Sequence, residues 1–122
     1  MKAYTYVLNI CGKAIIQEPT EKDIREAAFA LDSREGEAFL ILERVETGTF
    51  LQAGGDRDVG FELACQDLEQ QQYRAMRDYS AGEIVRAFTS FCLGSSEWRN
   101  GSDWEFVGSA SPAEEEQSTA TA

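Results

Sequence analysis

The chain has 122 residues, of which 43% are hydrophobic, and this is enough for one domain with a single modest core. It carries 22 acidic and 11 basic residues and no histidine, so its formal net charge is −11. This charge disfavours nucleic acids and anionic membranes as partners, and the absence of histidine excludes ordinary zinc sites and Ser–His or Cys–His catalytic pairs.

The first elements in chain order are a strand and a helix. The β-rich run AYTYVLNI predicts a strand over residues 3–10. Residues 19–33 then predict a helix with Thr20 as N-cap, which ends in the segment 32–36. The apolar stripe of this helix recurs at the i, i+3, i+4 and i+7 positions, which are Ile24, Ala27, Ala28 and Leu31.

Short strands joined by tight turns are expected in the middle of the chain. They are EAFLILERV, GTFLQAGG after a Thr47–Gly48 turn, VGFELACQ, and QQYRAMRDY. The third run alternates: Glu62 lies on one face, and the opposite face carries Val59, Phe61, Leu63 and Cys65. The fourth run has the weakest pattern and is expected at an edge of the sheet.

A second helix is predicted over residues 80–94. Ser80 and Glu83 form an S-x-x-E capping box, and Gly94 stands where a left-handed residue commonly follows a helix. The order β-α-β-β-β-β-α predicts an α+β fold, in which both helices pack on one face of a four- to five-stranded antiparallel meander. The domain is expected over residues 1–107, followed by a flexible acidic tail over 108–122.

The three cysteines, Cys11, Cys65 and Cys92, are widely spaced and lie among apolar residues. Three is an odd number, and the chain has no CxxC pair. The pattern therefore predicts reduced, buried thiols in a cytoplasmic protein. The N-terminus is too short and too polar for a signal peptide, and no apolar run approaches transmembrane length.

The segment AGGDRDVG at residues 53–60 has the composition of a phosphate or calcium loop. It lacks the GxxxxGK[ST] pattern of a P-loop and the ligand spacing of an EF-hand. We interpret it as a hairpin loop with left-handed glycines at Gly54 and Gly55. The sequence therefore predicts no metal, no cofactor and no catalytic residue, although paired carboxylates leave a metal-dependent hydrolase as an alternative.

Two tryptophans, Trp98 and Trp104, stand in the polar segment EWRNGSDWEF. WEFV has strand character, so Trp104 is expected to cover the core, whereas Trp98 suits either a lid or an exposed anchor. The uncovered side of the sheet should present polar groups bordered by aromatic rings, as protein interfaces do. The candidate contact residues for a protein partner are Trp98, Tyr73, Arg74, Glu62 and Asp56.

Residues 49–106 resemble small bacterial single-domain proteins that have a YLQAGG hairpin, an acidic strand, an S-x-x-E-[IV] helix and a terminal F-x-x-[FY]-x-x-G-x-x-x-W…W segment. Several of these families resemble the predicted immunity proteins of polymorphic toxin systems. The positions that carry the resemblance are Gly55, Glu62, Phe88, Gly94, Trp98 and Trp104. Cys92 and Leu93 depart from the aromatic–Leu pair that is more usual in such proteins, and the acidic tail lies outside the pattern.

The resemblance implies an α+β protein that binds and blocks a cognate toxin without catalysis of its own. An acidic surface would then imitate a polyanionic substrate and speed the capture of a basic toxin domain. The expected partner is accordingly a basic protein rather than nucleic acid or membrane. The alternatives are a carboxylate-based hydrolase and an accessory homodimer.

Overall fold

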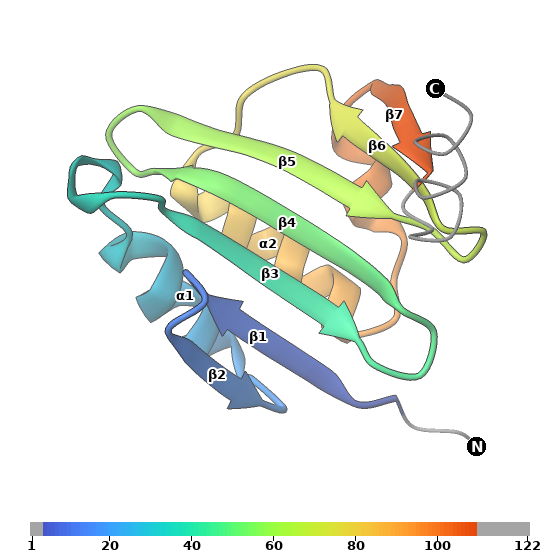
Figure 1. Ribbon diagram of the computed structural model, residues 1–122, viewed down its shortest axis with the longest axis horizontal. Helices are drawn as coiled ribbons and strands as arrows, with labels where there is room; N and C mark the ends of the chain where they lie inside the picture. The colour runs from blue at the N-terminus through green and yellow to red at the C-terminus, as the bar shows by residue number, and fades with distance from the viewer. Residues whose placement is uncertain (1–3, 110–122) are drawn as a thin grey trace, which may run out of the picture.

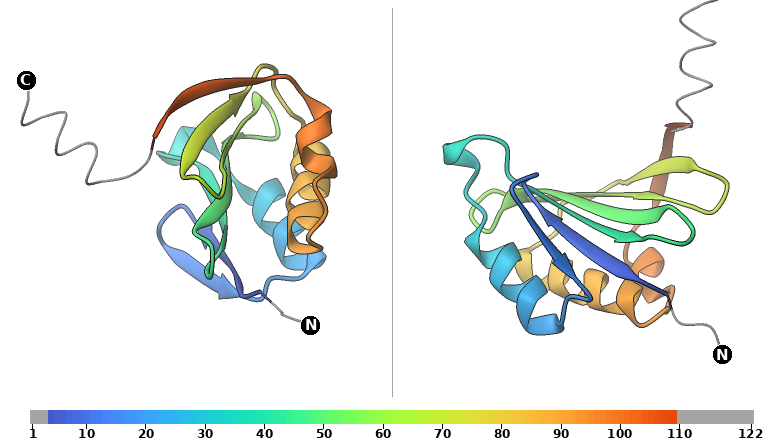
Figure 2. Two further views of the ribbon diagram at one scale, coloured as in Figure 1. Left: turned by 90° about the vertical axis from the view of Figure 1, so that its right-hand side faces the viewer. Right: turned by 60° about the horizontal axis from the view of Figure 1, so that its bottom comes forward.

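The computed structural model describes residues 4–109 (Figure 1). They form one antiparallel sheet and two α-helices, and both helices lie on the same face of the sheet (Figure 2). The α+β class is confirmed, but the sheet has seven strands rather than four or five, in the order β2-β1-β3-β4-β5-β6-β7. The strands are β1 Tyr6–Ile10, β2 Ala14–Gln17, β3 Phe39–Arg44, β4 Thr49–Asp56, β5 Gly60–Gln66, β6 Gln71–Ala75 and β7 Trp104–Ser109.

Both helices begin at the caps that the sequence predicts. Helix α1 spans Glu21–Ala30, and the Thr20 side chain accepts a hydrogen bond from the backbone N–H of Asp23. Helix α2 spans Ala81–Cys92 and has the Ser80–Glu83 capping box. Gly94 follows α2 with φ of 76°, in the left-handed region where glycine avoids the Cβ clash. Two short 3₁₀ turns, η1 Ser33–Glu35 and η2 Glu97–Gly101, follow the helices.

The core lies between the helices and one face of the sheet. Strand alternation and register place apolar side chains opposite one another, as in the row Leu8–Leu42–Leu51. Phe61, Leu63 and Cys65 point into this core as predicted, but Val59 lies in the turn before β5 and is 70% exposed. The largest side chains that are fully buried include Phe61, Phe88, Leu8, Ile24, Leu40 and Leu42.

Two strands lie outside the predicted meander: β2 was not expected, and β7 corresponds to the strand character of WEFV. β2 folds back on β1 after a turn in which Cys11 and Gly12 have φ of 57° and 71°. β7 pairs with β6, so β6 is an internal strand and its expected edge position is wrong. The predicted tail begins at Gly108, yet Gly108 and Ser109 belong to β7; the remaining tail residues, 110–122, lie outside the described part of the chain.

The β4–β5 hairpin differs from the predicted glycine loop. Gly54 and Gly55 are the sixth and seventh residues of β4, and the turn follows at residues 57–59. Gly55 has φ of 131°, and a Cβ there would collide with the carbonyl oxygen of Gly60. Gly54 does not have a positive φ, so only one of the two glycines has the expected conformational role.

Candidate protein-binding site

One face of the sheet has no described element packed on it (Figure 2). Successive side chains of a strand point to opposite faces of the sheet, so every second residue of each strand points toward this bare face. These residues include both polar and apolar ones. Gln52 and Glu62 are exposed there, and Phe39, Ile41 and Phe50 are partly exposed. We call this surface the bare sheet face, and its composition combines aromatic and aliphatic groups with acidic and amide groups.

A shallow hollow of about 470 Å³ lies on the bare sheet face. It forms because Gly54 and Ala64 offer little or no side chain between larger neighbours. Phe39, Glu62 and Arg74 are among the residues that line it. Two of the predicted contact residues, Glu62 and Arg74, therefore lie together on one surface.

The guanidinium of Arg74 is held in place on this face. Its Nη2 lies 2.6 Å from Oε1 of Glu105 on the adjacent strand, and both side chains are about half exposed. The hydrogen bond that Arg74 donates to Glu105 raises the pKa of Arg74, so its guanidinium is charged at neutral pH. Because the pair is exposed to solvent, we treat it as an orienting contact rather than a large contribution to stability.

Tyr73 does not join these residues. It precedes Arg74 in β6, and consecutive strand residues point to opposite faces. Tyr73 is paired with Cys65 and with Phe106, and it lies on the helix side of the sheet. Its ring meets the ring of Phe106 edge-on, with centroids 5.7 Å apart.

Trp98 is half-buried in an aromatic cluster at the β7 end of the sheet. Its ring lies edge-on to Phe91 at 5.9 Å and to Trp104 at 5.8 Å between centroids. Trp104 is also half-buried, and its Nε1–H donates to the carbonyl of Arg99 at 2.8 Å. Both rings therefore cover the core, while a contact of Trp98 with a partner stays a prediction.

The side chain of Asp56 is only 4% exposed, and its hydrogen bonds are made within the chain. One carboxylate oxygen accepts from the N–H and hydroxyl of Ser33, at 2.9 and 2.7 Å. The other accepts from the N–H groups of Asp58 and Val59. These bonds, above all those from Ser33, hold the pKa of Asp56 well below its usual range. Asp56 thus ties the β4–β5 turn to the segment after α1.

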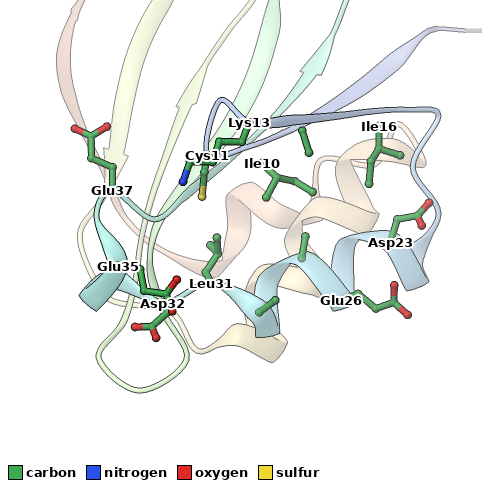
Figure 3. Close-up of a pocket in the computed structure, with 13 residues that line it drawn as sticks. Ile10, Cys11, Lys13, Ile16, Asp23, Glu26, Leu31, Asp32, Glu35 and Glu37 are labelled. Carbon is green, nitrogen blue, oxygen red and sulfur yellow. The ribbon is translucent and has the colours of Figure 1, made fainter.

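The sequence analysis missed a groove between the β1–β2 hairpin and α1, shown in Figure 3. Its volume is about 430 Å³. Ile10, Ile16 and Leu31 face its interior, and the carboxyl groups stand around its border. We call this the α1–β2 groove. Its lining residues are Ile10, Cys11, Lys13, Ala14, Ile16, Asp23, Glu26, Ala27, Ala30, Leu31, Asp32, Glu35 and Glu37.

Two carboxylates of the groove are already engaged locally. The backbone N–H of Thr20 lowers the pKa of Asp23, and the guanidinium of Arg34 lowers that of Asp32. Both are therefore ionised at neutral pH. The spacing of Asp23, Glu26 and Ala30 on α1 was a signal available in the sequence, because these positions share one helix face beside the apolar stripe.

Two of the three thiols are poorly suited to act as nucleophiles. Burial raises the pKa of Cys65 and of Cys92 to about 11, so both thiols are protonated at neutral pH. Cys65 is buried as predicted, whereas Cys11 and Cys92 are only partly buried. Within residues 4–109, no group of three or more His, Cys, Asp or Glu side chains is placed to hold a metal ion.

Neither helix in the described part of the chain is long and apolar enough to cross a membrane. Comparison with protein-family models, with curated proteins and with solved structures finds no match to this chain.

Proposed function

We propose that this chain is a stoichiometric binding protein that blocks a basic partner, as an immunity or inhibitor protein blocks a toxin domain, and that it acts in the cytoplasm. The bare sheet face carries the proposal. Partly exposed Phe39, Ile41 and Phe50 lie there beside the charged groups of Glu62 and Arg74. Exposed apolar groups rimmed by polar ones are typical of protein interfaces.

Charge supports a basic partner in particular. The chain carries a formal net charge of −11, and Glu43, Glu62 and Glu105 all belong to the bare sheet face. Only Arg74 opposes them on the strands β3 to β7 of this face, and Glu105 pairs with it. An acidic surface of this kind accelerates encounter with a basic protein and disfavours acidic ones.

The experiment is a growth assay in a bacterial host. The C-terminal domains of secreted proteins encoded beside the gene of this chain are expressed with and without it. We expect one of them to arrest growth alone, and co-expression to restore growth through a 1:1 complex. If every such domain is harmless or is unaffected by this chain, the inhibitor proposal fails.

Two charge reversals locate the surface that is used. Glu62→Arg changes the bare sheet face, and Glu69→Arg makes the same change at the exposed β5–β6 turn. We expect Glu62→Arg to weaken the complex at least tenfold and Glu69→Arg to leave it within about twofold, because rim charges far from the contact are screened. Equal effects of the two variants would remove the bare sheet face from the binding surface.

A further inference from the structure

The β2 edge of the sheet is open within the described residues, because β2 pairs only with β1. The N–H of Glu18 donates to the carbonyl of Tyr6 at 2.8 Å, and this bond sets the alternation of the antiparallel ladder. The backbone N–H and C=O groups of Ile16 and Ala14 therefore point toward β1. The backbone N–H and C=O groups of Ile15 and Gln17 consequently point away from the sheet, where an added strand would meet them.

Within its four residues, β2 carries no lysine, no proline and no bulge. Natural edge strands often carry a lysine, a proline or a bulge that prevents another strand from adding. β2 reads Ala-Ile-Ile-Gln, pairs with β1 in regular register, and exposes 58% of Ile15. The strand is short, so it suits one short extended segment better than a long one.

The α1–β2 groove lies directly on the helix side of this edge (Figure 3). In a strand added to β2, every second side chain would point toward α1. Ala14, Ala27 and Ala30 are small, and with Ile16 and Leu31 they leave an apolar space of about 430 Å³. This space has room for side chains of moderate size, and the alternate side chains would lie beside Ile15 on the other face.

The charge at the groove selects among the possible occupants. Its lining has one cationic residue, Lys13, against the five carboxylates of Asp23, Glu26, Asp32, Glu35 and Glu37. Arg34 pairs with Asp32 and Lys22 pairs with Glu26 beside the groove, so negative charge still exceeds positive charge around it. A second copy of this chain that paired through β2 would bring the same carboxylates close to one another, and like charges disfavour that arrangement. A basic segment gains from the same field.

We infer that the β2 edge and the α1–β2 groove bind an extended basic segment of the partner protein, which adds to the sheet as a further strand. The segment alternates aliphatic residues, which enter the groove, with lysine or arginine residues, which reach the surrounding carboxylates. This inference rests on the proposed function, because it names the part of the basic partner that is recognised.

The test uses the full chain and a synthetic octapeptide of alternating valine and lysine, followed by NMR of the backbone amides. We expect saturable shifts at Ile15, Gln17 and the α1 face that carries Glu26. A peptide with glutamate in place of lysine should not bind. A peptide N-methylated along one edge, which cannot donate to β2, should bind at least tenfold more weakly.

Ile15→Pro is the decisive variant. It removes a free edge N–H without removing a hydrogen bond to β1, and proline is tolerated on edge strands. We expect at least a tenfold loss of peptide affinity, whereas Ile15→Val, which keeps the donor, stays within about twofold. Without peptide, the backbone amides distant from residue 15 should have the same chemical shifts in the variant as in the wild type, which shows that the fold is intact.

Three outcomes overturn the inference. They are the absence of saturable shifts at millimolar peptide, shifts confined to the bare sheet face, and a dimer of this chain that Ile15→Pro abolishes. The peptide assay requires no toxin, so the two proposals fail separately. Growth rescue without peptide shifts removes this site, and peptide shifts without rescue remove the inhibitor function.

Discussion

The space between the sheet and the helices is filled at one end of the sheet and open at the other. At the β7 end, Phe91, Trp98 and Trp104 fill that space with three rings in edge-on contact. At the β2 end, the corresponding space is lined by alanines such as Ala14 and Ala30 and stays open as a groove. Large aromatic side chains therefore cover the core at the β7 end, whereas small side chains leave a groove at the β2 end.

The largest expected effect separates the two ends by stability. Trp104→Ala removes a ring that packs on Trp98 and a hydrogen bond to Arg99, so we expect the free energy of unfolding to fall by about 3 kcal/mol. Ile15→Ala at the β2 end should change it by less than about 0.5 kcal/mol. Urea unfolding measures both, and similar losses would contradict the contrast.

Asp56→Asn should have the second largest effect on stability. It weakens the hydrogen bonds from Ser33, whose neighbours Asp32 and Glu35 line the α1–β2 groove. The lowered pKa of Asp56 means that its stabilising effect is complete above about pH 4, the ordinary pKa of an aspartate. The effect is lost as pH falls through the lower pKa of the folded state. We expect the variant to have a lower urea midpoint at pH 7, with the gap to the wild type narrowing in acid. Asp58→Asn, at an exposed position, is the control.

Ala30→Trp tests whether the β2 end can be closed as the β7 end is. A ring at this exposed position would occupy the α1–β2 groove, so we expect at least a tenfold loss of affinity for the valine–lysine peptide. The free energy of unfolding should stay within about 0.5 kcal/mol of the wild type. Leu93→Trp, after α2 and outside the groove, should bind the peptide normally. Undiminished binding by Ala30→Trp would place the peptide elsewhere.

The smallest effect concerns cysteine reactivity. The sulfur of Cys11 faces the groove, whereas burial and the raised pKa slow the thiols of Cys65 and Cys92 (Figure 3). We expect iodoacetamide to modify Cys11 first, as read by peptide mass mapping, and bound peptide to slow that modification a few-fold. Equal protection of Cys92 would indicate a general change in the fold rather than occupancy of the groove.

Features that depend on neighbouring residues could be predicted from the sequence. Thr20, Ser80 and Glu83 cap the helices because each cap bonds to backbone only three residues away. Strand alternation likewise separated Glu62 from the core-facing Phe61 and Leu63, and it put Glu62 on the surface where Arg74 also lies.

Features that join distant segments could not be predicted in this way, because they depend on how the elements pack. Tyr73 was grouped with Arg74 although adjacent strand residues face opposite ways, and Asp56 gave no sign in the sequence that Ser33 would bind it. β2 is four residues long, too short for a clear pattern, and its edge position follows from the pairing of β1 with β3. The groove arises because α1 packs beside that edge, and such packing depends on contacts between separate elements that no local pattern encodes.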